Sequence, residues 1–489
     1  MKYSVAIPEM LQRILFRHLV RADGQEDCCF ALYNPSQGSK RLSAVLKEIV
    51  LPLGGERQVH GNVSFNPAYY DRVCDMALEK GCGICFMHSH PGPGWQNMSS
   101  DDVKAETMLA PRVMAISRLP LLGMTTGKDA TWSARFWIKK SPGKYERKWC
   151  ESVRVAGKGL RVDFYDTLLP KTVFGKAFTR TLSAWGDNKQ AVLSRLRVGI
   201  VGLGSVGSVV AEGLYKSGVR NIVFLDFDTV ELKNLDRLQG IGKKSIGEFK
   251  VDVVKKRLVK QQLFANGATT LTTSNFSVIE EAGLLDALNC DIIFCCVDRP
   301  WPRYVLNCIA YANCIPVIDG GIDTAINDAG DNLSYARWKA HTVGPHRICL
   351  NCLQQYVSED VGLEQSGLLD DPVYISGLPK EHFINRGENV FAFSVSLAAM
   401  ELQQFLSLVL QPRGQYYGPK EFDFNSGNTD DNFPFECNAN CSFPHKLGEG
   451  DKINKHLAAK HPFAETQRAG VKKKSRITTF INNLFNLMI

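Results

Sequence analysis

The hydrophobic and polar positions of this chain follow an irregular pattern in its first third and a regular one afterwards. Residues 1–21 carry apolar positions broken by Glu9, Arg13 and Arg17, which predicts an amphipathic helix. The patterns that follow predict strands at residues 28–33, 44–53 and 83–87 and a helix at residues 67–80. We therefore expect residues 1–150 to form an α+β domain.

From Leu196 onward, apolar strands alternate with amphipathic helices. RVGIVG, which starts at Arg197, predicts a strand, Ser208–Lys216 a helix, and NIVFLD, which starts at Asn221, a second strand. Such alternation is typical of an α/β fold with a Rossmann-like, doubly wound parallel sheet. Further strands are expected at residues 291–296 and 315–319. The predicted ranges are 151–195 for a basic connecting segment, 196–447 for the doubly wound domain and 448–489 for a basic, then apolar, tail.

The longest apolar run, Val390–Leu410, has the length of a membrane-spanning helix. Glu401, Gln403 and Gln404 interrupt this run, and no other segment of the sequence indicates a membrane protein. We therefore expect a buried helix here and no membrane partner.

Length and composition bound the class of protein. A chain of 489 residues with 44% hydrophobic and 22% charged residues is typical of a soluble protein of two or three domains. The net charge of +8 is spread along the chain, apart from a cluster at residues 472–476, so nucleic acid is not an expected partner. Fifteen cysteines, an odd count, with no signal peptide before them predict a reducing compartment, the cytoplasm.

A glycine-rich turn lies between the first strand and the first helix of the doubly wound region. In GLGSVG, Gly202 permits a tight turn, Gly204 lets the backbone approach a phosphate, and Gly207 lets the helix pack on the strand. Asp226 ends the next strand, where it can accept hydrogen bonds from ribose hydroxyls. Taken alone, this pattern is that of an NAD-dependent dehydrogenase.

The residues after this strand favour another chemistry. Asn234 and Arg237 follow Asp226 closely, Lys250 comes next, and Asp298 ends a later apolar strand. Hydride transfer needs no such cations around the phosphates. Nucleotidyl transfer does, because cations stabilise charge on the α-phosphate and the leaving pyrophosphate while a carboxylate holds Mg²⁺. Together these residues indicate adenylation.

Residues 196–445 resemble the ThiF/MoeB-type adenylyltransferases, the family that includes ubiquitin-activating enzymes. The family's glycine turn, D-x-D, N-x-x-R, lysine and late aspartate are matched by Gly202–Gly207, Asp226 with Asp228, Asn234 with Arg237, Lys250 and Asp298. The resemblance implies that ATP binds here, with Asp226 on the ribose, Arg237 and Lys250 on the phosphates, and Asp298 on Mg²⁺. It also implies a homodimer in which an arginine, matched by Arg180 in FTRTLSAWG, reaches the partner's active site.

Two cysteine pairs indicate a metal. CLNC contains Cys349 and Cys352, and CNANC contains Cys437 and Cys441. Two thiolate pairs separated by a folded segment suit a closed, tetrahedral, structural Zn²⁺. Unrelated buried cysteines are the alternative. Relatives that form a thioester carry a further cysteine after the first pair, but residues 353–436 contain none, so an acyl-adenylate is expected to pass to a thiol on another protein, such as a conjugating enzyme.

The stretch HSHPGPGWQNMSSDD suggests a second metal. His88 and His90 lie two residues apart, so in a strand they face the same side, and Asp102 at the start of a following helix can supply a third ligand. Three protein ligands leave a position for water, as a catalytic Zn²⁺ requires. Glu26, at the start of the strand after the opening helix, is the candidate base; the rivals are Glu48 and Glu56.

This constellation resembles the JAMM/MPN metalloisopeptidases, whose pattern is a distant Glu, H-S-H-P, and S-x-x-D. Glu26, His88, His90, Ser99 and Asp102 match that pattern. The resemblance implies that Glu26 activates the water and that Ser99 stabilises the oxyanion. The spacer before Ser99 is one residue longer than usual, which leaves Asp101 as an alternative ligand. A domain that keeps this fold without activity is the alternative to a peptidase.

The two halves predict one combined function. One half adenylates the C-terminus of a ubiquitin-like, β-grasp protein with ATP, and the other cleaves after such a C-terminus, as in prokaryotic ubiquitin-like systems. The alternatives are activation of a sulfur carrier for cofactor biosynthesis, an NAD-dependent oxidoreductase, and a scaffold whose two sites are inactive.

Overall fold

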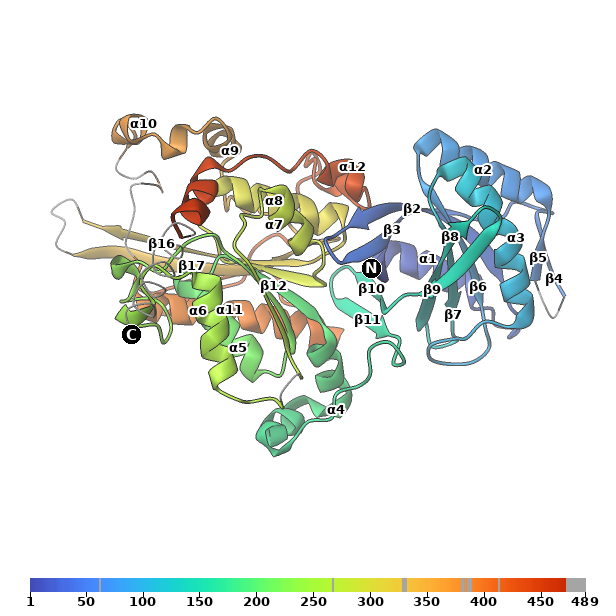
Figure 1. Cartoon of the computed structure of the whole chain (residues 1–489), viewed down its shortest axis with the longest axis horizontal. Helices are drawn as coiled ribbons and strands as arrows, with labels where there is room; N and C mark the ends of the chain where they lie inside the picture. Colours follow the sequence, from blue (N-terminus) through green and yellow to red (C-terminus); the bar gives the residue numbers. More distant parts are fainter. Residues whose placement is uncertain are drawn as a thin grey trace, which may run out of the picture.

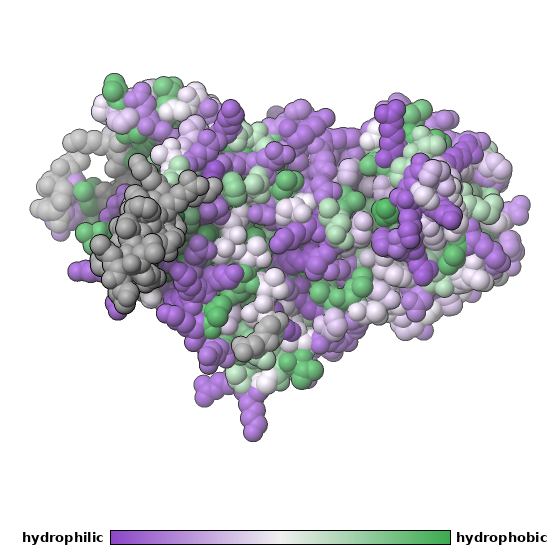
Figure 2. All heavy atoms as spheres, in the orientation of Figure 1, coloured by the Kyte–Doolittle hydropathy of each residue, from purple (hydrophilic) through white to green (hydrophobic). Residues whose placement is uncertain are grey.

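A computed structural model describes residues 1–60, 63–265, 268–327, 332–379, 382, 384, 389–411 and 414–471. Figure 1 shows two lobes side by side, each built around one large sheet. On the face drawn in Figure 2 the two lobes form a continuous surface that is mostly hydrophilic. The basic cluster at residues 472–476 and the apolar end of the predicted tail lie outside the described residues.

The N-terminal lobe contains a nine-stranded mixed sheet in the order β11-β10-β1-β3-β2-β6-β7-β8-β9. Helix α1 covers one face of this sheet, and helices α2 and α3 cover the other. The elements are β1 Lys2–Pro8, α1 Glu9–Leu19, β2 Cys28–Gln37, β3 Arg41–Val50, β4 Arg57–Val59, β5 Val63–Phe65, α2 Pro67–Lys80, β6 Gly83–Ser89, α3 Ser100–Ser117, β7 Leu121–Thr126, β8 Trp132–Ser141, β9 Lys144–Trp149, β10 Ser152–Ala156 and β11 Leu160–Phe164.

The prediction that the chain opens with a helix is wrong for residues 2–8. Residues Lys2–Pro8 form strand β1, and helix α1 begins only at Glu9. Strand β1 lies inside the sheet, paired in parallel with β3 and β10, and Val5, Ala6 and Ile7 are all buried. A strand buried on both faces has no polar alternation, so its sequence pattern cannot be told from that of a buried helix.

The segment predicted as a connection also belongs partly to this sheet. Strands β10 and β11 pair with each other, and β10 pairs with β1, so the sheet extends past residue 150 to Phe164. Only after this strand does the chain leave the sheet for helix α4, which leads into the second lobe.

The second lobe contains an eight-stranded sheet in the order β14-β13-β12-β15-β16-β17-β18-β19. The first five strands in this order, β14, β13, β12, β15 and β16, run parallel, as a doubly wound fold requires. The last three, β17, β18 and β19, are added in antiparallel orientation. The first elements are η1 Lys176–Phe178, α4 Thr179–Arg195, β12 Arg197–Val201, α5 Ser205–Lys216, β13 Asn221–Leu225, η2 Leu232–Asn234, η3 Lys243–Ser245, α6 Lys250–Lys260, β14 Thr270–Ser274, α7 Glu281–Ala287 and β15 Ile292–Cys295. The remaining elements are α8 Pro300–Ala312, β16 Val317–Ile326, β17 Leu333–Val343, α9 Ser358–Gln365, η4 Leu368–Asp370, α10 Pro372–Ser376, α11 Phe391–Leu410, β18 Lys420–Asp423, β19 Asn428–Asp430, η7 Pro444–Lys446 and α12 Asp451–Asn454.

Helices cover both faces of this parallel sheet. Helices α5, α6 and α11 contribute to the core on one face, and α7 and α8 to the core on the other. Burial on both faces explains why the strands read as continuous apolar runs. The long apolar segment is helix α11, the one helix among the described residues that is long and apolar enough to cross a membrane. It packs on α5, β16 and β17, and Leu397, Ala398 and Phe405 are buried there.

The two lobes share a buried interface. Arg41 of β3 donates to Oδ1 of Asp291 at 2.5 Å, and Arg154 of β10 lies 3.6 Å from the same oxygen. All three side chains are almost fully buried. The apolar core of the second lobe also continues into the first through residues such as Val45 and Leu160. The sheets are therefore held together by both charge and packing.

Residues after Leu447 return to the body of the protein. Helix α12 contacts both β2 and α8, and Asp451 accepts a hydrogen bond from the backbone N–H of Gln37. Residues 462–471 are helical and lie against the second lobe, at the dark red end of the described chain in Figure 1. The described part of the predicted tail thus packs against both lobes.

Candidate functional site

The glycine turn has the geometry expected of a phosphate-binding loop. Gly202 follows strand β12 with φ +88°, a conformation that favours glycine. A Cβ on Gly207 would lie 2.0 Å from the carbonyl oxygen of Gly202, so helix α5 packs directly against the turn. A Cβ on Gly204 would meet nothing within 4 Å, which leaves the backbone at the start of α5 open to a ligand.

Asp226 follows β13, beside the glycine turn. Its carboxylate accepts hydrogen bonds from the backbone N–H groups of Leu203 at 2.6 Å and Asp228 at 2.8 Å. Burial raises the pKa of Asp226 to about 6, against the opposing effect of the Lys250 charge. The carboxylate is therefore held in place by the turn itself, next to where a ribose would follow the phosphates.

Lys250 pairs with the neighbouring acidic groups. Its Nζ donates to Oδ2 of Asp228 at 2.7 Å, and the lysine is almost completely buried. Burial acts to lower the pKa of Lys250, but Asp226 and Asp228 outweigh it and the pKa is raised. The group is thus a fixed cation at neutral pH, as charge stabilisation on phosphates requires.

These residues line one cavity of about 850 Å³ at the carboxyl ends of the parallel strands. Such a crevice is where α/β sheets bind ligands. The sequence-predicted residues on its wall are Gly202, Gly204, Asp226, Asp228, Asn234, Arg237, Lys250 and Asp298. Gly207 lies behind the turn, and Arg180, exposed on α4, is not among the described residues that line this cavity.

Sequence reasoning missed two groups on this wall. One is aromatic: Phe227, Phe276, His461 and Phe463. The other is charged: Arg303 lines the cavity and lies 3.4 Å from the carboxylate of Asp319, which is fully buried behind the wall. Phe227 and Phe276 lie two residues after the ends of β13 and β14, which was a usable signal. The two C-terminal aromatic residues reach the wall only through the tertiary fold.

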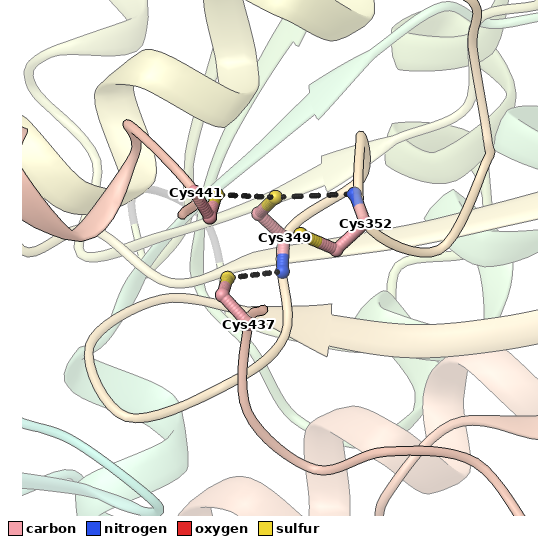
Figure 3. A group of neighbouring side chains, drawn as sticks. All are labelled: Cys349, Cys352, Cys437 and Cys441. Atoms are coloured by element: carbon pink, nitrogen blue, oxygen red, sulfur yellow. Dashed lines mark hydrogen bonds between the residues drawn. The ribbon is translucent and has the colours of Figure 1, made fainter. Parts of the chain in front are cut away.

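The four predicted zinc-site cysteines converge. Their sulfur atoms lie within 4.8 Å of one another, with Cys349 and Cys441 3.6 Å apart (Figure 3). The backbone N–H of Cys349 donates to the sulfur of Cys437 at 3.2 Å, and that of Cys352 to the sulfur of Cys349 at 3.3 Å. Hydrogen bonds to sulfur favour thiolates, so this donor set fits a tetrahedral Zn²⁺.

The second candidate metal centre joins β6 to α3. Nε2 of His88 lies 3.2 Å from one carboxylate oxygen of Asp102, and Nε2 of His90 lies 3.3 Å from the other. Burial acts to raise the pKa of Asp102, but hydrogen bonds with both histidines outweigh it and hold that pKa well below its usual range. Two imidazoles and one carboxylate with ligand atoms within 4.8 Å fit a zinc ion with a remaining open position.

The helix start decides which aspartate faces the histidines. Ser99 caps α3: its hydroxyl accepts from the backbone N–H of Asp102, whose carboxylate accepts from the backbone N–H of Ser99 at 2.7 Å. This capping box turns Asp102 toward the histidines. Asp101 instead points to solvent, 3.2 Å from Lys104. The O–H of Ser99 remains able to donate to a substrate.

Glu26 lies beside these groups. Strands β2 and β6 are antiparallel with Cys28 opposite His88, and the backbone N–H of Ser89 donates to the carbonyl of Asp27. Glu26 directly precedes Asp27, and its charge contributes to raising the pKa of His90, after the larger effect of Asp102. The rivals are engaged elsewhere, Glu48 with Lys80 and Glu56 with Arg72.

The longer spacer before Ser99 forms an ordered loop. Gly94 has φ +77°, and its N–H donates to Asp129 at 3.0 Å, while the side-chain amide of Gln96 donates to three backbone carbonyls of the loop. Trp95 stacks on Tyr165 with ring centroids 5.0 Å apart. These contacts hold the loop between His90 and Ser99 in one conformation.

A buried ion pair is connected to the same site through Thr125. Arg135 and Glu106 are fully buried and paired, and Arg135 also donates to the Thr125 hydroxyl at 2.6 Å. That hydroxyl lies 3.3 Å from Nε2 of His88. The network links strand β8 and helix α3 to the first histidine.

Comparisons with known proteins address the second lobe. Residues 178–361 match the model of the ThiF family. The chain is 32% identical over 132 residues to the molybdopterin-synthase adenylyltransferase of Escherichia coli (strain K12), covering 27% of this chain and 51% of that protein. It is 33% identical over 136 residues to ubiquitin-like modifier-activating enzyme 5 of Arabidopsis thaliana, covering 25% of this chain and 30% of that protein.

Among solved structures, the chain is similar to Escherichia coli MccB with ATP, at 17% identity and a TM-score of 0.41 over 55% of this chain and 74% of that one. The chain spans about half, or less, of the length of the first curated relatives it matches. The family match begins at the junction with α4, earlier than the predicted start at residue 196. Residues 178–361 are therefore a ThiF-family domain.

Proposed function

We propose that this chain adenylates the C-terminal carboxylate of a small ubiquitin-like, β-grasp protein with ATP. The observation that carries this proposal is the single cavity in which an open glycine turn, Asp226, Lys250 and Asp298 meet. A nucleotide fits this order of groups, with phosphates at the turn and ribose at Asp226. The similarity to adenylyltransferases and ubiquitin-like activating enzymes supports the same chemistry.

In the proposed reaction a carboxylate oxygen of the protein tail attacks the α-phosphorus of ATP. The bond from that phosphorus to the bridging oxygen breaks, pyrophosphate leaves, and an acyl-adenylate remains. Lys250 and Arg237 stabilise the charge that develops on the phosphates. Asp298 would hold Mg²⁺, which supplies further positive charge on the phosphates when bound.

The acyl group is then proposed to pass to a thiol on another protein. Residues 353–436 contain no cysteine, and Cys295, Cys308 and Cys314 are fully buried. Cys296 lines the cavity, but burial raises its pKa well above the ordinary value, which disfavours the thiolate that attack requires. A homodimer in which Arg180 reaches the partner's cavity, and a cytoplasmic location, remain part of the proposal.

We further propose that the N-terminal lobe hydrolyses the amide bond after such a C-terminus. Zn²⁺, held by His88, His90 and Asp102, would supply a Lewis acid when bound. Glu26 would take the proton of the attacking water and return it to the leaving amine. The Ser99 hydroxyl would donate to the oxyanion, a role that its cap geometry leaves open because the hydroxyl accepts, rather than donates, within the cap.

ATP–pyrophosphate exchange tests the adenylation proposal. The assay compares wild type, Asp298→Ala and Asp187→Ala with a candidate β-grasp protein encoded nearby. Asp187 is exposed on α4 and serves as the matched control. We expect partner-dependent exchange in the wild type and the control, and a loss of about 100-fold or more in Asp298→Ala. Absence of exchange with every such partner would contradict the proposal.

Sulfur-carrier activation is a second candidate, favoured by the similarity to the molybdopterin-synthase adenylyltransferase. It shares the exchange reaction, so the acceptor of the acyl group distinguishes the two. Transfer to a sulfur donor yields a thiocarboxylate on the carrier, whereas conjugation yields an amide on a second protein; mass spectrometry of the activated partner separates these products.

A further inference from the structure

A segment outside the family match forms part of the wall of the cavity. The segment begins at the buried Leu457, which belongs to the same apolar core as Val278 and Ile279. It continues into the helical residues 462–471. The backbone N–H of Ala459 donates to the carbonyl of Ile279 at 2.9 Å. This contact places the segment beside the loop that follows strand β14.

Two aromatic side chains of this segment lie on the cavity wall. His461 and Phe463 both line the cavity, and both contact Phe227, which sits between Asp226 and Asp228. The Phe227 ring centroid lies 5.0 Å from that of His461 and 6.0 Å from that of Phe463. Phe463 is 52% exposed although it faces this cavity, so it retains apolar surface that a planar ligand would cover.

The segment is anchored firmly. Arg468 forms an ion pair with Glu280 in which both side chains are about nine-tenths buried, and it donates to the backbone carbonyl of Asn275 at 3.1 Å. Its guanidinium lies 4.4 Å from the ring centroid of Phe276, another residue of the cavity wall. The position of the segment is therefore fixed by charge and stacking on the loop after β14.

The sheet order identifies which part of a nucleotide would meet these rings. Strands β12, β13 and β14 are neighbours. The glycine turn follows β12 and Asp226 follows β13, so phosphate and ribose take these two positions in order. The base lies beyond the ribose, which places it over the third position, after β14, where Phe276 and the C-terminal segment meet.

We propose that His461 and Phe463 form the base-side wall of the ATP site, so that the C-terminal segment is a part of the nucleotide-binding site. The ligand class is a planar heteroaromatic base, held by stacking. The inference rests on the proposed function only in taking ATP as the nucleotide.

The test measures ATP and inorganic tripolyphosphate binding to the full chain by calorimetry, without any protein partner. The variants are Phe463→Ala and His461→Asn. Nδ1 of His461 accepts a hydrogen bond from the backbone N–H of Ala464 at 3.1 Å, and the side-chain oxygen of asparagine can accept the same bond. Glu465→Ala, an exposed change in the same helical turn, is the control. The melting temperature of each variant is measured as well, to check that the variant folds.

We expect each wall variant to weaken ATP binding by about 5- to 50-fold, because a stacked base contributes roughly this much. Tripolyphosphate, which lacks base and ribose, should bind within twofold of wild type, and the control should match wild type for both ligands. Unchanged ATP affinity in both folded variants would overturn the inference, as would an equal loss of tripolyphosphate binding. A wild-type chain that does not bind ATP would overturn the proposed adenylation as well, which is a separate outcome.

Discussion

Nε2 of His88 and Oδ1 of Asp102 lie 3.2 Å apart, the first at the end of strand β6 and the second in the first turn of helix α3. The distance is set by the backbone at both places. The histidine is fixed in a ladder with β2 and β7, and the aspartate by its capping box with Ser99. Such fixed ligands are what a preformed metal centre needs.

The zinc content of variants tests whether Asp102 or Asp101 is the metal ligand. Asp102→Asn should lower zinc affinity at the N-terminal site by more than the 10- to 100-fold typical of residues that only support ligands. Asp101→Asn should keep full affinity, because Asp101 faces Lys104 and solvent. Zinc is measured by mass spectrometry after dialysis against a chelator of graded concentration, with the four-cysteine site as internal reference. Equal loss in both variants would refute the assigned ligand.

Glu26→Gln should abolish hydrolysis while zinc is retained. General base catalysis contributes about 10²- to 10⁴-fold, and glutamine cannot accept the proton. Glu48→Gln is the matched control, since Glu48 pairs with Lys80 elsewhere. Cleavage of a C-terminally extended β-grasp partner is followed by mass spectrometry. Normal cleavage by Glu26→Gln, or loss only in the Glu48 variant, would rule out the proposed base.

Two glycines of one turn should respond differently to alanine. A Cβ on Gly207 would lie 2.0 Å from the Gly202 carbonyl, so Gly207→Ala should destabilise the fold by about 1–3 kcal/mol. Gly204→Ala meets no atom within 4 Å and should fold normally. Its methyl group would occupy the space of a phosphate, so ATP binding should weaken by about tenfold. Urea unfolding and calorimetry measure the two effects; similar behaviour of the two variants would contradict the loop assignment.

The buried charge at the lobe interface should be costly to remove. Asp291→Asn leaves Arg41 and Arg154 without their carboxylate partner, which should cost about 3–5 kcal/mol. Asp71→Asn, at an exposed pair with Arg112, should leave the unfolding midpoint almost unchanged. Chemical unfolding of both variants at neutral pH provides the comparison. A small effect at Asp291 would show that this buried charge cluster contributes little to joining the lobes.

His341 should make stability sensitive to mild acid. It is fully buried in β17, and burial, with the nearby charges of Arg303, Lys339 and Arg347, lowers its pKa to about 3. The unfolded chain binds this proton near pH 6.5, whereas the folded chain does not. Stability is therefore complete above about pH 6.5 and falls by up to about 1.4 kcal/mol per pH unit as the pH drops toward 3.

The contribution of His341 is separated from that of other groups by substitution. His341→Gln cannot titrate, so its unfolding free energy should change less steeply between pH 6.5 and 5 than that of wild type. Urea unfolding at pH 7.5, 6.0 and 5.0 gives both slopes. Parallel slopes would mean that other groups dominate acid sensitivity in this range.

Local patterns in the sequence determined much of this protein. Helix α2 has the predicted bounds, Pro67–Lys80, because Asn66 caps its start and Gly81 adopts a left-handed conformation at its end, and both signals are local. The glycine turn between β12 and α5 was predictable for the same reason, since the strand, the glycines and the helix are contiguous. Cysteine spacing likewise indicated the pairs of the four-cysteine cluster.

Only the tertiary structure decided what depends on distant partners. Strand β1 is a strand because β3 and β10 flank it, and no residue within Lys2–Pro8 encodes those neighbours. Asp102 faces the histidines, rather than Asp101, because the capping box sets its direction relative to β6. His461 and Phe463 reach the cavity at the carboxyl ends of the parallel strands because Arg468 pairs with Glu280, far away in sequence. Sequence periodicity reports burial and local turns, whereas these contacts arise only when separate elements pack together.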